Sequence, residues 1–494
     1  MVLGVDGGSW KVMQPLADKG WMPNLSDLMS RGRWGDLLST IPYITCPAWI
    51  ALSTGRNPGW IGFFGFNNLE PASYKMRYYF YRADPELPEI WDILGKRDLA
   101  SGVMNNPVIR DPRPINGYMV PGFVADEHTY RTYPDDVKDV LETAAGGYQI
   151  EVIGFALQEP LRLVKDCEEL LEKRYSAMRA LLSERPTDFF LGVFHLCDRI
   201  CHSALNRTGL PIDPDRDELS AAVAGFFRKL DGYIGALVEE FVRAGDLFAL
   251  VSDHGFAPSP RSLNLNTWFI RKGYLHAEPT ARLPARVINK RKLAIALGKV
   301  GLFKPAMKYA PRFLRRMVPE GDREGAQTSI IDIIEADKVD WGNTLAVALP
   351  NHCIYLNSAD RPQGRIGEGA ERDAFIEGLC LELLDLKDPE TGERPIAAVH
   401  RREEIYEGER LGHAPDLVVE AVEGWTTKAA LDSEGRLAVR ECMADHRREG
   451  VFLLMGEGIK AAGGHVADIE DMAPTFLSFL GIDDHSPMDG HSLL

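Results

Sequence analysis

The sequence predicts an α/β fold, in which a doubly wound, mostly parallel sheet is flanked by helices and loop or helical insertions form a small cap. Two observations support this prediction. Short, continuous apolar runs end in acidic residues or glycine, as is typical of strands buried on both faces of a sheet. Stretches of helical period lie between these runs, and strand–helix–strand order implies right-handed crossovers within one sheet. The 494 residues suffice for one large domain with insertions or for two or three smaller ones.

Three predicted strands in the first half of the chain each lead toward an acidic residue. The strands are 2–5, 189–194 and 247–252. The acidic residues that follow them are Asp6, Asp198 and Asp253. Between the strands, 160–184 and 216–243 place apolar side chains on one stripe and charged ones opposite, which predicts helices. Ligands of doubly wound sheets bind outside the carboxyl ends of the strands, so the three carboxylates are expected at a binding site.

The second half of the chain resumes this alternation after an interruption. Residues 276–334 combine proline, basic residues and short apolar groups, and they are predicted to be a basic helical insertion or cap. The core is then formed by 1–275 and 335–494. Its further strands are expected at 344–349, 353–356 and 415–421, and its further helices at 371–386 and 470–480. Residues 66–90 show weak periodicity, which predicts a long loop near Thr45.

The charge distribution argues against general nucleic-acid binding and singles out the insertion. The net charge is −16, whereas nucleic-acid binding requires a basic surface. Residues 282–317 nevertheless contain eleven Lys or Arg and no Asp or Glu. We expect this segment to pack as a lid on the acidic body. The alternatives are peripheral contact with an anionic membrane and steering of an anionic substrate.

Cysteine use and the apolar runs predict a cytoplasmic protein. The seven cysteines include no CxxC pair and have an odd count, which favours a reducing compartment over a disulfide framework. Because the first residues already form a predicted strand, a signal stretch is not expected. Uninterrupted apolar runs stay well short of the roughly 18 residues of a membrane span.

Six residues supply the side chains that two adjacent divalent metal ions require, three carboxylates and three imidazoles. They are Asp6, Asp198, His202, Asp253, His254 and His446. On a helix, Asp198 and His202 would share one face, because they lie four residues apart. Asp253 and His254 are adjacent, so both reach one site only if the chain turns there, which Gly255 permits. Taken singly, each has a commoner explanation, such as a solvated pair, a strand-ending turn, a helix cap or a surface histidine.

Thr45 adds a hydroxyl group in a distinctive local context. Pro47 is favoured in the first turn of a helix, which predicts that Thr45 lies at or just before an N-cap. Backbone N–H groups and the partial positive charge of a helix start would favour an attacking alkoxide and a bound phosphoryl group. A bound metal would lower the pKa of the hydroxyl further. The alternative is an ordinary capping threonine.

The order of these groups resembles the alkaline phosphatase superfamily, particularly its type I phosphodiesterase/nucleotide pyrophosphatase-like branch, which includes phosphohydrolases and phosphomutases. The resemblance covers most of the chain, and its combined pattern is specific although each piece is short. The segments that carry it are 2–8, 42–49, 54–59, 197–202, 251–255, 414–420, 446–450 and 467–480. It implies an alkaline phosphatase-like catalytic core.

The resemblance also implies how two divalent ions would be held. One ion would be bound by Asp6, Asp253, His254 and the Thr45 hydroxyl. The other would be bound by Asp198, His202 and His446. Zinc is the expected metal, and manganese is the alternative found in mutase-like relatives.

The match is less complete in the region after the Thr45 helix. Relatives often carry a histidine where this chain has Ile61. Asn67 and Asn68 lie where nucleotide-cleaving relatives place an asparagine that binds a phosphate oxygen. The alternative for this pair is an ordinary Asx turn.

The function implied is metal-dependent hydrolysis of phosphate esters, of the phosphodiesterase/nucleotide pyrophosphatase type, with a phospho-threonine intermediate at Thr45. A phosphomonoesterase or phosphomutase on the same fold is the alternative, and a metal-free binding protein is the non-enzymatic one. A sulfatase is disfavoured because Cys46 lacks the Cys-x-Pro-x-Arg context. The expected partner is a small-molecule or lipid-linked phosphate ester. The leaving group and the oligomeric state stay open.

Overall fold

The structure is a computed structural model that describes residues 1–494 except 79–85, 153, 156–157, 278–338 and 433. The basic segment 282–317 and nearly all of the predicted insertion 276–334 therefore lie outside the described residues. For the same reason, the predicted division into a core of 1–275 and 335–494 with an inserted cap stays a prediction.

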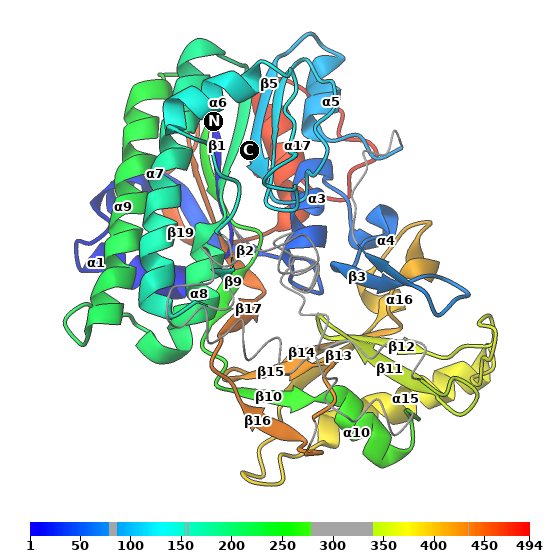
Figure 1. The fold of residues 1–494 in the computed structure, drawn as a ribbon. Helices are drawn as coiled ribbons and strands as arrows, with labels where there is room; N and C mark the ends of the chain where they lie inside the picture. Colours follow the sequence, from blue (N-terminus) through cyan, green and yellow to red (C-terminus); the bar gives the residue numbers. More distant parts are fainter. Residues whose placement is uncertain (79–85, 153, 156–157, 278–338, 433) are drawn as a thin grey trace.

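An eight-stranded sheet forms the centre of the larger lobe (Figure 1). Its strands, in spatial order, are β19 (Ala462–Asp468), β2 (Arg33–Leu38), β18 (Glu449–Met455), β8 (Phe248–Val251), β1 (Val2–Val5), β7 (Phe189–Phe194), β5 (Ser101–Asn106) and β6 (Gly117–Pro121). Neighbours run parallel except at β18, which is antiparallel to both β2 and β8. Every residue of β1, β7 and β8 is buried, as continuous apolar runs predict.

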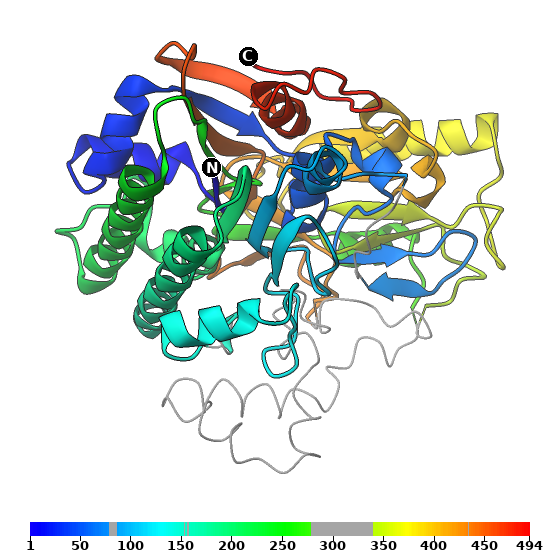
Figure 2. The ribbon, with the colours of Figure 1, turned by 90° about the horizontal axis from the view of Figure 1, so that it is seen from above.

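Helices cover both faces of this sheet, which confirms the doubly wound α/β fold (Figure 2). One layer contains α7 (Pro160–Glu184) and α9 (Glu218–Phe241), with α2 (Pro23–Arg31) and α6 (Val137–Ala145) beside them. The other contains α3 (Thr45–Thr54), α5 (Ile90–Gly95) and α17 (Met472–Phe479). Close packing explains two strand glycines. A Cβ on Gly4 would lie 2.4 Å from the Trp49 ring of α3, and one on Gly192 would lie 2.9 Å from Met178 of α7.

A smaller lobe with its own hydrophobic cluster lies below the main sheet in Figure 1. Its four-stranded antiparallel sheet has the order β11 (Ala346–Leu349), β12 (Cys353–Leu356), β14 (Leu417–Ala421) and β13 (Ile396–Arg401). A three-stranded sheet has the order β15 (Trp425–Lys428), β10 (Arg261–Asn264) and β16 (Ala438–Arg440). Helices α10 (Leu265–Lys272) and α15 (Ala370–Asp385) complete this lobe.

Short elements link the two lobes and carry part of the candidate site. Strand β9 (Gly255–Ala257) pairs antiparallel with β17 (Asp445–Arg447), and α8 (Leu196–Thr208) follows β7. The remaining short elements are α1 (Trp10–Asp18), α4 (Pro58–Ile61), α16 (Arg402–Ile405), η5 (Leu411–His413) and η6 (Ile469–Asp471).

Residues 66–90, predicted to be a loop, instead contain a short hairpin of β3 (Asn67–Leu69) and β4 (Met76–Tyr78).

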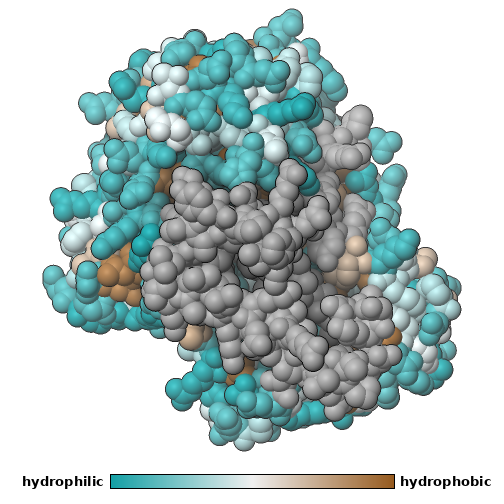
Figure 3. Space-filling model, viewed as in Figure 1, coloured by the Kyte–Doolittle hydropathy of each residue, from teal (hydrophilic) through white to brown (hydrophobic). Residues whose placement is uncertain are grey.

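The surface of the described residues is mainly hydrophilic on the face drawn in Figure 3, with small, separated apolar spots. Among the described residues, none of the helices combines the length and the apolar character needed to span a bilayer.

Candidate metal centre

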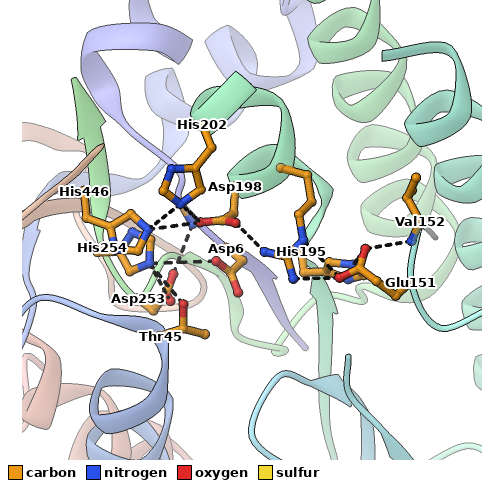
Figure 4. A network of polar contacts seen from close by, with 12 residues as sticks. Asp6, Thr45, Glu151, Val152, His195, Asp198, His202, Asp253, His254 and His446 are labelled. Carbon is orange, nitrogen blue, oxygen red and sulfur yellow. Dashed lines mark hydrogen bonds and ion pairs between the residues drawn. The ribbon is translucent and has the colours of Figure 1, made fainter. Parts of the chain in front are cut away.

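The fold brings the six predicted ligands and Thr45 together at the carboxyl edge of the main sheet (Figure 4). Asp6 directly follows β1, Asp198 lies in the first turn of α8 after β7, and Asp253 and His254 connect β8 to β9. His446, in the middle of β17, comes from far along the chain. Parallel strands end at the same edge of a sheet, and the strand pairing therefore places these groups side by side.

Two glycines allow the backbone to pass close to this centre. Gly7 adopts a positive φ of 70°, which turns the chain after Asp6, and its N–H donates to Asp253 Oδ1 at 3.1 Å. Gly255 was predicted to permit the turn after His254, but its φ is not positive. A glycine is required there because a Cβ would lie 1.9 Å from the Glu449 carbonyl oxygen.

Thr45 is the first helical residue of α3, whose N-cap is Ile44. The predicted position, at or just before the N-cap, is therefore displaced by one residue. Among the described residues no side chain caps this helix, so the explanation as a capping threonine does not apply. Thr45 is buried, and its Oγ1 instead lies 3.3 Å from His254 Nε2. The hydroxyl thus faces the predicted ligands from the positive end of a helix.

The residues predicted to hold the first ion form one cluster. Asp6, Asp253 and His254 each offer a ligand atom within 4.8 Å of the others. His254 Nε2 lies 3.2 Å from Asp253 Oδ2 and 3.9 Å from Asp6 Oδ1. All three residues are completely buried.

The residues predicted to hold the second ion converge as closely. His446 Nε2 lies 3.2 Å from Asp198 Oδ1 and 3.0 Å from His202 Nε2. His202 Nε2 lies 3.4 Å from the same carboxylate oxygen, and α8 places both side chains on one face, as the four-residue spacing predicts. The rings of His254 and His446 stack with their centroids 3.7 Å apart, so the two clusters adjoin.

Hydrogen bonds at Nδ1 fix the tautomer of all three histidines. Nδ1 lies 2.9 Å from the Ala444 carbonyl oxygen in His202, 3.3 Å from that of Tyr43 in His446 and 3.3 Å from that of Gly255 in His254. A carbonyl oxygen can only accept, and each Nδ1 therefore carries the proton. In the neutral form of each ring, Nε2 then has a lone pair directed at the cluster, which is the arrangement of metal-bound histidines.

The donor set fits divalent ions because it is otherwise uncompensated. Neither carboxylate oxygen of Asp6 accepts a hydrogen bond from the described residues, although the side chain is completely buried. His202 Nε2 and His446 Nε2 lie only 3.0 Å apart, although both rings donate from Nδ1 to a carbonyl oxygen. Burying an unpaired charge is costly, and a bound cation would remove this cost for all of these atoms at once.

The electrostatics of the metal-free cluster agree with this fit. Burial raises the pKa of Asp6 well above its usual range, and the charges of Asp253 and Asp198 push it further. Burial also raises the pKa of Asp253 to about 7. Burial lowers the pKa of His254 well below its usual value, and the nearby His446 lowers it further. A divalent ion would reverse these preferences, since it favours ionised carboxylates and neutral imidazoles.

Asp198 and His446 behave differently because they form an ion pair. Burial opposes ionisation of Asp198, but His202, His446 and Arg199 outweigh it and hold its pKa well below the usual range. Burial lowers the pKa of His446, yet the hydrogen bond and the charge of Asp198 outweigh it and raise that pKa.

A buried network beside the centre was not predicted from the sequence. Arg199 contacts Asp198 and Glu151, and Glu151 in turn contacts His195. A basic residue directly after a predicted ligand and directly before the apolar Ile200 was the available signal. A second unpredicted group is Asp445, which together with His202 and His446 forms a further cluster able to hold a metal. Its position immediately before His446 in the sequence was the signal.

The two asparagines predicted to bind phosphate have different environments. Asn68 is engaged by its own loop, since Oδ1 accepts from Phe64 N–H and Nδ2 donates to the Gly65 carbonyl. That pattern resembles the alternative explanation, a side chain that braces a turn. Asn67 is also buried, but its Nδ2 makes no hydrogen bond to the described residues.

Comparisons with known proteins identify the family and the fold of the chain. The family model described as type I phosphodiesterase/nucleotide pyrophosphatase matches residues 1–446. No curated protein matches the chain.

Solved structures share the fold at low sequence identity. Murine ectonucleotide pyrophosphatase/phosphodiesterase 5 is 14% identical with a TM-score of 0.50, over 99% of this chain and 96% of its own. Phosphonoacetate hydrolase from Sinorhizobium meliloti 1021, in complex with phosphonoacetate, is 14% identical with a TM-score of 0.55, over 98% and 95%. Wild-type alkaline phosphatase PafA is 13% identical with a TM-score of 0.55, over 100% and 97%.

Proposed function

Because the chain belongs to the type I phosphodiesterase/nucleotide pyrophosphatase family, we propose that it cleaves phosphodiester or pyrophosphate bonds of small molecules, with Thr45 as the nucleophile. The family places the chain among the phosphoric ester hydrolases of the alkaline phosphatase superfamily. The identity of the nucleophile, the metals and the preferred substrate are the parts that we propose.

Two groups of residues would hold two divalent ions. Asp6, Asp253 and His254, with the Thr45 hydroxyl, would hold the first ion. Asp198, His202 and His446 would hold the second. When bound, such ions polarise the phosphoryl oxygens and stabilise the charge that develops during displacement. Zinc suits the mixture of imidazole and carboxylate ligands, and manganese is the alternative.

Residues of the chain would also stabilise the nucleophile and bind the phosphoryl group. The N-terminus of α3 stabilises the Thr45 alkoxide after its proton is lost to solvent. The alkoxide oxygen forms a bond to phosphorus while the bond to the leaving group breaks, and the product is a phospho-threonine. A water molecule hydrolyses this ester, which returns the hydroxyl and releases phosphate or a phosphate monoester. Asn67, whose buried Nδ2 has no partner among the described residues, would donate to a phosphate oxygen.

The observation that carries this proposal is the buried, unsatisfied donor set. Both oxygens of Asp6 lack a hydrogen-bond partner among the described residues, and the Nε2 atoms of His202, His254 and His446 are directed at the same cluster of carboxylates. A protein that had lost its metals would be expected to neutralise or replace such groups. The complete set therefore favours an active centre over a metal-free binding protein.

Replacement of Thr45 tests the proposal. The metal-loaded wild type, Thr45→Ser and Thr45→Ala are compared on p-nitrophenyl phosphate, bis-p-nitrophenyl phosphate and the p-nitrophenyl ester of thymidine monophosphate. We expect the two diesters to be preferred, Thr45→Ser to retain activity and Thr45→Ala to lose about a thousandfold or more in kcat. Wild type quenched in acid during turnover should carry a phosphoryl group on Thr45, which retains the second ester group when the substrate is a diester. Near wild-type turnover by Thr45→Ala would exclude Thr45 as nucleophile, and a preference for the monoester would make the protein a phosphomonoesterase.

A further inference from the structure

Arg199 is a completely buried cation immediately after one of the proposed ligands. It lies in α8 at 1% exposure. A buried guanidinium is strongly unfavourable unless its N–H groups are paired. Arg199 Nη1 donates to Asp198 Oδ2 at 2.5 Å, while Nε and Nη2 donate to Glu151 Oε2 at 2.9 and 2.6 Å. The cation thus joins the two carboxylates.

Two aromatic rings hold the guanidinium in place. Its central carbon lies 4.4 Å from the ring centroid of Phe123 and 4.4 Å from that of Phe155. A planar cation between aromatic faces gains cation–π attraction and has little freedom to rotate. Its hydrogen-bond directions toward Asp198 are therefore set by its surroundings.

The far end of this contact is anchored as well. Glu151 Oε1 accepts from the Val152 N–H at 2.7 Å and lies 3.2 Å from His195 Nε2. The other ring nitrogen, His195 Nδ1, lies 2.7 Å from Arg174 Nη1. Figure 4 shows Glu151, His195 and Val152 on the side of Asp198 away from the other ligands. The network therefore extends from the metal centre into the layer of helices, and its contacts with several segments restrict movement of Arg199.

As a result, the two oxygens of Asp198 have separate partners. Oδ2 is engaged by Arg199, whereas Oδ1 faces His446 Nε2 at 3.2 Å and His202 Nε2 at 3.4 Å. Only Oδ1 is directed at the place where the second ion would lie. A carboxylate held in this way offers one ligand atom, which suits a tetrahedral ion that keeps a position open for substrate.

We propose that Arg199 is a positioning residue for the second metal site: it holds Asp198 Oδ2 so that Asp198 binds the ion through Oδ1 alone. This inference rests on the proposed function, because it assumes that Asp198 is a metal ligand. Partners of metal ligands commonly change metal affinity about 10- to 100-fold when removed. If Arg199 only held α8 against the segment that carries Glu151, its removal would lower the stability of the fold. It would not weaken metal binding at one site more than at the other.

The test compares metal binding by the wild type, Arg199→Gln, Arg199→Lys and Arg174→Gln. Arg174→Gln is the matched control, because it removes a fully buried guanidinium from the same network without touching Asp198. Zinc affinities come from competition with a chromophoric chelator. Anomalous diffraction at limiting zinc assigns the occupancy of each position, and circular dichroism checks the fold.

We expect Arg199→Gln to bind the second ion at least about tenfold more weakly, with little change at the first site. Arg199→Lys should fold and should lose less zinc affinity at the second site, because an ammonium group keeps the charge. It should still lose some affinity, because it lacks the planar guanidinium that pairs with both carboxylates. Arg174→Gln should weaken the second site less than Arg199→Gln does, because it leaves the contact between Arg199 and Asp198 in place. If Arg199→Gln does not fold, the Arg199→Lys result decides.

Two outcomes would overturn the inference in distinguishable ways. Wild-type affinity of the second site in both Arg199 variants would show that Arg199 has a structural role alone, and the proposed function would stand. Failure of the wild type itself to bind two ions would instead remove the proposed metal centre, and the inference with it.

Discussion

Asp6 is the clearest sign at the residue scale that this cluster requires a cation. Its carboxylate is completely buried, neither oxygen has a hydrogen-bond partner of standard geometry among the described residues, and the carboxylates of Asp253 and Asp198 raise its pKa further. Such a group is unfavourable when ionised in a metal-free protein. The ionised carboxylate becomes favourable only with a metal ion beside it. Asp6 therefore destabilises the metal-free fold and contributes to the binding of the ion.

Asp6→Asn should therefore separate binding from folding. We expect the variant to lose the first ion and to hydrolyse bis-p-nitrophenyl phosphate at least about a hundredfold more slowly. Because the folded-state pKa of Asp6 is raised, the metal-free wild type loses stability as pH rises through that pKa. The metal-free variant should lack this loss and be at least as stable at pH ~8. Urea unfolding in a chelator gives the comparison, and lower stability of the variant would contradict it.

His195 predicts a loss of stability in mild acid. Burial lowers its pKa from 6.5 to about 4, although the charge of Glu151 opposes the shift. The unfolded chain therefore binds a proton between these pH values that the folded chain does not, so the free energy of unfolding falls as pH drops from 6.5 to about 4.

His195→Gln is the corresponding test, since glutamine does not titrate. Urea unfolding of the metal-free proteins at several pH values should give a flatter pH dependence for the variant across this window. An equally steep dependence in both proteins would show that other groups cause the acid sensitivity.

At the scale of elements, the turn between β8 and β9 depends on close packing rather than on an unusual backbone conformation. A Cβ on Gly255 would lie 1.9 Å from the Glu449 carbonyl oxygen, a backbone atom that cannot move independently of β18. Gly255→Ala should therefore displace β9, destabilise the protein by about 1–3 kcal/mol and move His254.

The matched control for this change is Gly378→Ala. Gly378 lies inside α15, and a Cβ there would meet no atom within 4 Å. Alanine favours helix over glycine, so this variant should be more stable by about 0.5–1 kcal/mol. Thermal unfolding and zinc affinity measure both variants. Unchanged stability and metal binding in Gly255→Ala would contradict the packing argument.

Sequence patterns predicted three central strands of the main sheet, β1, β7 and β8, because a buried apolar run is a local signal. The helix expected at 160–184 spans the same residues as α7. Strand ends also identified Asp6, Asp198 and Asp253, since a buried apolar run followed by a carboxylate marks the carboxyl edge of a sheet. The three histidines were identified from their spacing to these carboxylates and from the order of the motifs.

Features that depend on distant partners were not predicted. Strand β10 pairs with β15 and β16, which lie more than 150 residues further along the chain, so no local pattern reveals this pairing. The role of Arg199 depends on Glu151 and two aromatic rings from other segments. Likewise, the need for glycine at position 255 comes from Glu449.

At the scale of the whole molecule, the metal centre lies where the two lobes join. His446 belongs to β17, which comes between β16 of the smaller lobe and β18 of the main sheet. Its neighbour Asp445 contacts Thr426 of β15, and His352, which precedes β12, lies 3.9 Å from the same carboxylate. An ion bound by His446 therefore connects the main sheet to strands of the smaller lobe.

Metal removal should consequently destabilise the entire protein. Free zinc at about a hundredfold above its Kd would stabilise the folded state by about 2.7 kcal/mol per site. We expect differential scanning calorimetry to show a lower Tm after chelation and recovery on adding zinc. His446→Ala should show a much smaller response to zinc. An equal Tm with and without metal would mean that the ions do not bind the folded protein tightly.

Anomalous diffraction from zinc-soaked crystals, recorded on both sides of the zinc absorption edge, tests the central claim most directly. Two peaks are predicted in each molecule, one among Asp6, Asp253, His254 and Thr45 Oγ1, the other among Asp198, His202 and His446. The account would be contradicted by crystals without a peak at these residues, or by a single ion bound elsewhere.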